Sequence, residues 1–438
     1  MKSLYDQIQD IPLYDTHMHA SSLSSVGAKR ADGFETDITP ACPAGETTLI
    51  TLLCAPYMLG NHMATGLYHP SETEDFASQW AALQPALAVE RGTGLFIALD
   101  TALQDLYGIS LSRVMREGVA TAQTLSHMIA ARYAKGLFAW SAQAMRRARI
   151  VHALKPVHAA YIKRVSEGDV SPEYSLERSM YTPIFRTDDL FGRLDAENRL
   201  IFPQLEEGLG IRIHSLAALE QAIDALYTYI QRVGSPCVKQ AQAYLRPITF
   251  EKRTRAEAKA AFSAALAGDA DAARIVQDYV MENILSRGMT YQIHTGVANL
   301  GNTSPVLLRG AIERHPKVKF VLLHGYPHLS EAINLVRFYQ NVYLDFSWLQ
   351  LLSPTVQAAA LREAIGFVPM NKIFLSTDAT SPEEQYGAAV GMRKVLAIVL
   401  EEKMSGDGWD EGLAMDAAHA LLHGNAECFY GKVLGELP

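Results

Sequence analysis

The sequence of 438 residues has few cysteines, no long apolar run and no excess of positive charge. The net charge of −8 argues against nucleic acid or an anionic membrane as a partner, since both bind best to a positively charged surface. No stretch reaches the ~18 apolar residues of a membrane span. The amino-terminal stretch "MKSLYDQIQDIP" also lacks the apolar core of a signal peptide.

The cysteines and the missing motifs indicate the redox environment of the protein and exclude several classes of enzyme. The spacing of the cysteines matches no zinc ribbon or redox motif, so we expect reduced thiols and a cytoplasmic protein; they are Cys42, Cys54, Cys237 and Cys428. The chain has no G-x-S-x-G elbow, no P-loop and no H-E-x-x-H pair. These absences exclude α/β serine hydrolases, P-loop NTPases and zincins.

Short apolar, β-branched runs recur along the chain, and several end in a polar residue. They lie at 11–17, 149–154, 181–186, 237–244, 289–296, 318–325, 341–347 and 371–378. Helical periodicity fills the stretches between the last four runs. Alternating strands and helices imply parallel strands, and eight such strands predict an α/β fold, a (β/α)₈ TIM barrel.

The spacing of these runs is uneven. The first two are separated by a stretch that is too long for one crossover and is rich in Ala, Leu and Gln. We interpret residues 20–146 as a helical insertion after the first strand, within a single barrel that spans 1–438. A second helical insert is expected at 254–288, before the fifth strand.

Polar residues stand at the ends of the expected strands, which meet at one mouth of a barrel. They are His17 and His19 on the first strand, His294 on the fifth, His324 on the sixth and Asp378 on the eighth. Alternation along a strand points His17 and His19 inward and Met18 outward. Two imidazoles and a carboxylate suit Zn²⁺, Fe²⁺ or Mn²⁺, and a third histidine would complete the set with one position open to water. We therefore predict a metal site that activates water, with a nearby carboxylate as the proton acceptor.

The phrases "DTHMH", "IHTG", "LLHGYP" and "STDA" resemble the amidohydrolase superfamily of metal-dependent barrels. The closer resemblance is to the amidohydrolase-2 branch, including the amidohydrolase part that is fused to glutamine-synthetase-like proteins. It covers residues 11–19 and roughly 235–438, and it is poor across 20–230. Its motifs are specific for the superfamily but not for a substrate.

The resemblance implies a role for each matching position. His17, His19, His294 and Asp378 match metal ligands, and Asp378 also matches the residue that shuttles the proton. His324 matches a histidine that polarises the substrate in one-metal members and binds a second ion in two-metal members. For Lys239 on the fourth strand three alternatives stand: it carries a carbamate that bridges two metals, it pairs with a substrate carboxylate or a barrel acid, or it lies at the surface. Because "VKQAQAY" resembles the one-metal branch, we expect one divalent ion, zinc in the first place.

The remaining candidates are substrate contacts. Arg186 ends the third strand, where it either binds a substrate carboxylate or forms a surface salt bridge. Tyr244 and Arg246 follow the fourth strand, and Tyr326 follows His324 in "HGYPH".

The resemblance also implies the reaction. We expect hydrolysis of an amide-like C–N bond in a small polar or carboxylate-bearing substrate, with His324 stabilising the oxyanion. A decarboxylase, a hydratase or a uronate-isomerase-like enzyme would use the same ligands, whereas a barrel without catalytic function is disfavoured by the complete ligand set. Barrels of this type often self-associate, so a homo-oligomer is expected, with no nucleic-acid or membrane partner.

Overall fold

The computed structural model describes residues 3–19, 47–71, 73, 75–166 and 172–431. Eight strands form one parallel sheet in the order β1-β2-β3-β6-β7-β8-β9-β10. The strands span Leu13–Asp15, Ile150–Val157, Tyr181–Arg186, Cys237–Gln240, Thr290–Thr295, Phe320–His324, Val342–Asp345 and Ile373–Phe374. Every one overlaps an expected run, although β2 continues three residues past the run at 149–154, and the predicted TIM-barrel fold is confirmed.

Backbone hydrogen bonds join the two ends of the sheet. The Asp378 amide donates to the His17 carbonyl oxygen at 2.8 Å, and the His19 amide donates to that of Ala379 at 2.7 Å. These bonds tie the segment after β1 to the segment after β10. Closure therefore occurs beside the polar residues that end the first and last strands.

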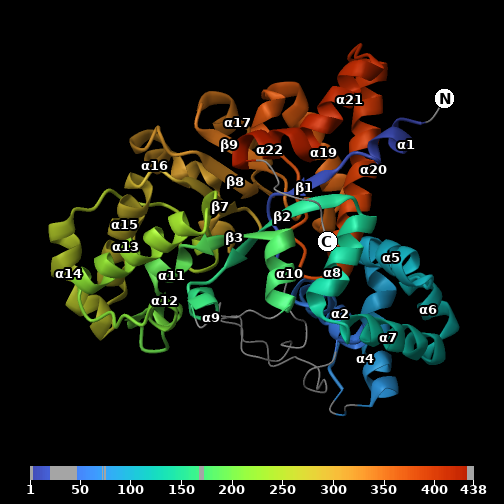
Figure 1. Cartoon of the computed structure of the whole chain (residues 1–438), viewed down its shortest axis with the longest axis horizontal. Helices are drawn as coiled ribbons and strands as arrows, with labels where there is room; N and C mark the ends of the chain where they lie inside the picture. Colours follow the sequence, from blue (N-terminus) through green and yellow to red (C-terminus); the bar gives the residue numbers. More distant parts are fainter. Residues whose placement is uncertain (1–2, 20–46, 72, 74, 167–171, 432–438) are drawn as a thin grey trace.

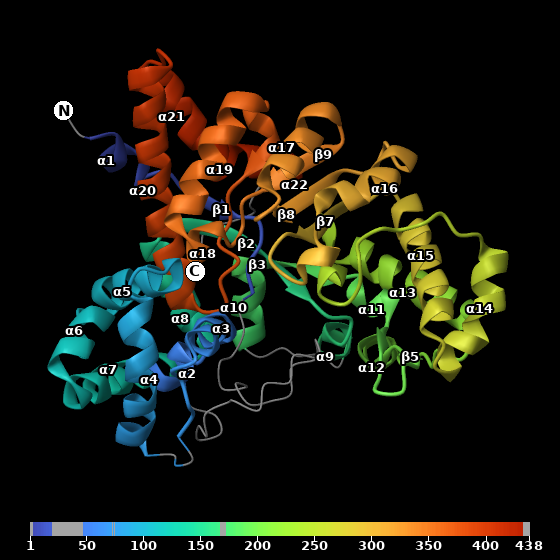
Figure 2. The same cartoon turned by 180° about the vertical axis from the view of Figure 1, so that it is seen from behind.

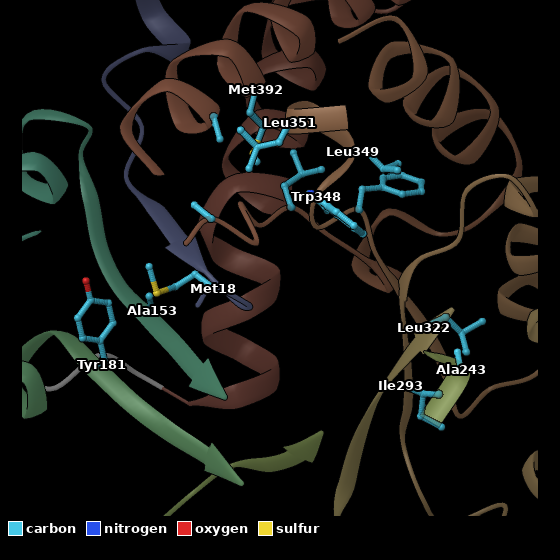
Figure 3. Close-up of a cluster of buried hydrophobic side chains, with 14 of the residues drawn as sticks. Met18, Ala153, Tyr181, Ala243, Ile293, Leu322, Trp348, Leu349, Leu351 and Met392 are labelled. Atoms are coloured by element: carbon cyan, nitrogen blue, oxygen red, sulfur yellow. The ribbon is translucent and has the colours of Figure 1, made fainter. Parts of the chain in front are cut away.

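The strands are buried on both faces, since helices cover the outside of the barrel. All five residues of β8 are buried, as are all four of β6. Met18 belongs to the large buried apolar cluster that also contains Ala153 and Tyr181 (Figure 3). Its side chain is thus in the core, as the alternation of the first strand predicts.

Helices follow nearly every strand. Those of the barrel itself are α9 (Tyr161–Ser166), α10 (Pro172–Met180), α11 (Asp188–Phe191), α12 (Pro203–Leu209), α13 (Leu216–Arg232), α14 (Arg255–Ala267), α15 (Ala270–Ser286), α16 (Arg309–Arg314), α17 (Leu329–Phe338), α18 (Leu349–Leu352), α19 (Pro354–Phe367) and α20 (Pro382–Gly406). The terminal helices are α1 (Leu4–Ile8), α21 (Glu411–His419) and α22 (Asn425–Tyr430).

Between β1 and β2 the described residues are helical. They form α2 (Leu49–Leu53), α3 (Pro56–Thr65), α4 (Phe76–Glu90), α5 (Gly94–Tyr107), α6 (Leu111–Glu117), α7 (Val119–Tyr133) and α8 (Leu137–Arg147). Figures 1 and 2 show α4–α7 gathered on one side of the barrel, away from α13–α15. Part of the expected insertion, residues 20–46 with Cys42, lies outside the described residues. The division into one barrel with an insertion at 20–146 stays a prediction.

The insertion is fixed to the first turn of α20 by a buried carboxylate. Glu383 accepts hydrogen bonds from Tyr107 Oη at 2.6 Å, Tyr133 Oη at 2.7 Å and Trp140 Nε1 at 2.8 Å. These donors come from α5, α7 and α8. One side chain therefore links three insertion helices to the helix that follows the last strand.

Some elements differ from the expected ones. The run at 237–244 is a strand only to Gln240, after which residues Gln242–Tyr244 form a 3₁₀ turn. A small hairpin, β4 (Arg193–Leu194) with β5 (Leu200–Ile201), follows α11 and has no clear signal in the sequence. The described helices include none that is long and apolar enough to cross a membrane.

Candidate metal centre

The candidate site lies at the carboxyl ends of the strands. Three buried residues at or just past the ends of β8, β9 and β10 have a left-handed backbone, with φ of 65° at His324, 67° at Trp348 and 53° at Asp378. Such a conformation costs about 1–2 kcal/mol for an L residue and persists only where its surroundings impose it. Backbone strain is thus concentrated at the mouth where the polar side chains meet.

His17, His19 and Asp378 form a compact cluster at this mouth. One nitrogen or oxygen from each lies within 4.8 Å of the others. His17 Nε2 is 3.6 Å from Asp378 Oδ1, and His19 Nε2 is 3.3 Å from the same oxygen. The His17 side chain is completely buried whereas 27% of the His19 side chain is exposed, so the cluster opens on the His19 side.

The tautomer of His17 directs a lone pair into this cluster. The amide nitrogen of Gln292 donates to the Thr16 carbonyl oxygen and to Tyr430 Oη, so its oxygen is left to accept from His17 Nδ1 at 2.8 Å. With the proton on Nδ1, His17 Nε2 is a buried acceptor that has no hydrogen-bond donor within the described residues. A buried, unpartnered imidazole nitrogen beside a carboxylate fits a divalent metal ion.

Burial sets the charge of the cluster. It lowers the pKa of His17 and of His19 well below the ordinary value, and the positive charge of Lys239 acts in the same direction. Both imidazoles are therefore neutral, which is the form that binds metals. Burial raises the pKa of Asp378, opposed by Lys239. This carboxyl group thus lacks a strong partner for its negative charge, as expected of a metal ligand in the absence of the metal.

His324 is adjacent to the cluster. Its Nε2 lies 3.6 Å from Asp378 Oδ2, and its Nδ1 lies 3.0 Å from the carbonyl oxygen of Ser347. Burial lowers the pKa of His324 to about 3, so the ring is neutral. The Ser347 hydroxyl oxygen also lies 2.9 Å from Nδ1 and can either donate or accept, so these contacts are compatible with a proton on either ring nitrogen. The oxyanion-stabilising role expected for His324 stays a prediction.

His294 lies beside His324 but outside the cluster of three. The two rings have centroids 4.5 Å apart, and His294 Nε2 lies 2.9 Å from the Val297 carbonyl oxygen. This contact places the ring proton on Nε2. Tyr244 covers the other side, with its ring 4.5 Å from that of His294. The structure thus does not bring His294 to the other three predicted ligands, and its role as a ligand stays a prediction.

A cavity of about 360 Å³ opens above the cluster, within the size range of ligand pockets. The residues that line it include His19, Asp378, Arg186, Lys239 and Tyr244. Lys239 is nearly fully buried, and burial together with the charge of Arg186 lowers its pKa to about 8. Arg186 donates to Asp188 Oδ2 at 3.1 Å. Two cationic side chains therefore face the same cavity as the candidate metal ligands.

Two predicted substrate contacts do not reach this cavity. Arg246 is buried elsewhere and bonds Asp278 at 2.6 Å and Gln277 at 3.1 Å, because the chain turns away after the short strand β6. Tyr326 is 40% exposed and does not line the cavity. The expectation that these residues meet the substrate is not supported by their positions.

Sequence reasoning missed three neighbours of the site. Gln292, which orients His17, stands two residues before His294, so strand alternation could have identified it as inward-facing. Tyr57 comes from insertion helix α3, and its hydroxyl lies 3.4 Å from Asp378 Oδ1. His158, which follows β2, also lines the cavity. No sequence pattern marks the last two, because their positions depend on how helices and loops pack.

Comparisons with known proteins agree with this architecture. Residues 220–432 match the family model described as amidohydrolase, Amidohydro_2. A uronate isomerase from Thermotoga maritima has a TM-score of 0.75 at 13% identity, with 98% of this chain and 96% of that chain covered. A glucuronate isomerase from Caulobacter crescentus has a TM-score of 0.72 at 15% identity, with coverage of 98% and 92%.

A third similar structure comes from Lactobacillus casei ATCC 334 and is assigned as a metal-dependent hydrolase. It has a TM-score of 0.63 at 17% identity, and 98% of each chain is covered. No curated protein sequence matches the chain. Residues 220–432 thus match the amidohydrolase family model, and the chain as a whole shares its fold with these structures.

Proposed function

We propose that the chain is a metal-dependent hydrolase that cleaves an amide-like C–N bond in a small, carboxylate-bearing substrate. The observation that carries this proposal is the cluster of His17, His19 and Asp378, with its buried unpartnered nitrogen, at the floor of a cavity that also contains Lys239 and Arg186. His17, His19 and Asp378 would hold one divalent ion. We propose zinc, and Mn²⁺ or Fe²⁺ suit the same donors.

A bound divalent ion would polarise a carbonyl group and lower the pKa of a water molecule. The chain supplies the other functions. Asp378 accepts the proton of the attacking water and returns it to the leaving amine. Neutral His324 faces Asp378 Oδ2 and accepts a hydrogen bond when that carboxyl group is protonated. Lys239 and Arg186 attract the substrate carboxylate, which orients the scissile bond over the cluster.

A second candidate reaction is an aldose–ketose isomerisation of a hydroxy acid. The observation that favours it is the likeness to two uronate isomerases over 98% of this chain. At 13% and 15% identity this likeness concerns the fold. The same cluster would then hold a hydroxy-carbonyl unit, and no water would be consumed.

Product analysis separates the two reactions. The zinc-loaded protein is incubated with N-acyl amino acids and, in parallel, with hexuronic acids. Release of a primary amine supports hydrolysis, whereas conversion of an aldose to a ketose of the same mass in unlabelled water supports isomerisation. Asp378→Asn should abolish either activity, and His69→Ala, at an exposed position, is the matched control. Turnover by Asp378→Asn at the wild-type rate would contradict the proposal.

A further inference from the structure

A second pair of ionisable side chains lies in the wall of the cavity. His158 follows β2, and Asp189 lies in α11; both line the same cavity as His19 and Asp378. His158 Nδ1 is 2.8 Å from Asp189 Oδ1. The Asp189 side chain is 4% exposed and that of His158 is 35% exposed, so the carboxylate is buried while the imidazole reaches into the cavity.

The contacts of Asp189 fix the orientation of the imidazole. Its second oxygen, Oδ2, accepts the Ala159 amide at 2.6 Å, so both carboxylate oxygens are held by residues 158 and 159. Because the carboxylate can only accept a hydrogen bond, the ring proton of His158 sits on Nδ1. Nε2 of the neutral imidazole is consequently an acceptor, and no described residue bonds to it. This is the arrangement in which an imidazole acts as a base.

The backbone that carries His158 is also held in place. Gly208 of α12 lies so close that a β-carbon there would be 2.1 Å from the Ala159 carbonyl oxygen. Only glycine allows this approach. The packing of α12 and the carboxylate of Asp189 thus hold the segment after β2 from two sides, which gives the imidazole a defined position.

We propose that His158 is a catalytic acid–base residue for the substrate bound at the candidate metal centre, with Asp189 as its positioning residue. The proposal rests on the proposed function and deepens it. Nε2 takes a proton from an O–H or N–H group of the substrate, or from water, and becomes an imidazolium beside the Asp189 carboxylate. It then returns this proton to the leaving group or to solvent. In the proposed hydrolysis His158 therefore shares with Asp378 the proton transfers to and from water and the leaving group.

The test uses 4-nitrophenyl acetate as the probe, with zinc-loaded and chelator-treated protein. His158 accepts a proton from the water that attacks the ester carbonyl, and the products are acetate and 4-nitrophenol. We expect His158→Ala and His158→Asn to lower kcat by about 100-fold or more, the low end for a general base, with little change in KM. Asp189→Asn should lower kcat less. His214→Ala, at an exposed position outside the cavity, should match the wild type.

The outcomes separate this inference from the proposed function. A wild-type kcat in both His158 variants would overturn the inference, as would a wild-type rate no higher than that of free imidazole at the same concentration. If zinc removal changes nothing but the His158 variants still lose activity, the inference stands and the metal-dependent function fails. If only zinc removal lowers the rate, the metal-dependent function stands and His158 has no catalytic role.

Discussion

Single residues around His17 determine how well the cluster can hold a metal. Gln292 holds the proton of His17 on Nδ1 and thereby leaves Nε2 free for a ligand bond. We predict that Gln292→Leu weakens metal binding by about 10–100-fold, the usual effect of losing the partner that orients a metal-bound histidine. The measurement is zinc competition with a chromogenic chelator.

The chain offers a matched control for this substitution. Gln357 in α19 is also fully buried, and neither atom of its amide group has a hydrogen-bond partner within the described residues. Gln357→Leu should therefore leave zinc affinity unchanged. Equal zinc affinity in Gln292→Leu and Gln357→Leu would show that the bond to His17 Nδ1 does not matter.

Lys239 gives a prediction for pH. A lysine is charged below its pKa, so its ammonium group is present at pH 7 and is lost as the pH rises through about 8. If this charge binds the substrate carboxylate, KM should rise above pH 8 in the wild type. Lys239→Met should have a raised KM that no longer changes across this range. A wild-type KM that stays constant from pH 7 to pH 9 would contradict the assigned role.

Residue patterns predicted only part of the site. His17 and His19 were expected to point inward because side chains alternate along a strand. Asp378 was expected beside them because it ends the last strand, and strand ends meet at one mouth of a barrel. Arg246 was placed too near the cavity, because a sequence does not show that a strand ends at Gln240 and continues as a 3₁₀ turn. Tyr57 was missed because its position depends on tertiary packing alone.

At the scale of elements, the insertion helices depend on Glu383. Glu383→Ala would leave two buried donors, those of Tyr107 and Trp140, and the half-buried hydroxyl of Tyr133 without this acceptor. At roughly 1–3 kcal/mol for each buried unsatisfied donor, we predict a loss of about 2 kcal/mol or more in the free energy of unfolding. Urea denaturation measures it.

An exposed glutamate serves as the comparison for Glu383. Glu402 pairs with Arg362 at the surface of the barrel, where solvent screens the ion pair and makes its contribution to stability small. Glu402→Ala should therefore have little effect on the urea midpoint. If Glu383→Ala were as stable as Glu402→Ala, the hydrogen bonds from the insertion helices to Glu383 would not contribute to stability.

The contact between α5 and α20 gives another test. A β-carbon at Gly387 would lie 2.0 Å from the Ala98 carbonyl oxygen, so Gly387→Ala must push the two helices apart. We predict that the free energy of unfolding falls by about 1–3 kcal/mol or more. Gly406, in the same helix, has no atom within 4 Å of such a carbon, and Gly406→Ala should be neutral or slightly stabilising. Thermal melting of the two variants would show whether they differ in this direction.

The elements of the barrel could be predicted because parallel strands buried on both faces leave continuous apolar runs. The run at 318–325 is an example, and β8 occupies Phe320–His324 within it. The hairpin of β4 and β5 could not be predicted, since each strand has two residues and no periodicity can appear over that length. The helical character of 49–147 followed from composition, but the packing of these helices against α20 did not.

For the whole molecule, the cluster lies where the barrel closes. His17 and His19 follow the first strand and Asp378 follows the last, and backbone hydrogen bonds already join these segments. A metal held by all three would crosslink the two ends of the sheet. Because the unfolded chain lacks this site, metal binding should add to folding stability. We predict that removing the metal with a chelator lowers the melting temperature and that adding zinc restores it, whereas Asp378→Asn should respond to neither treatment.

The most direct test of the account is the zinc content of the reconstituted, folded protein, measured by mass spectrometry after removal of unbound metal. We predict about one equivalent per chain in the wild type and less than about 0.3 in Asp378→Asn, because the carboxylate is one of three protein ligands. About two equivalents would indicate a bridged pair that involves Lys239. Fewer than about 0.3 equivalents in a wild-type protein with a normal melting transition would contradict the central claim that His17, His19 and Asp378 form a metal centre.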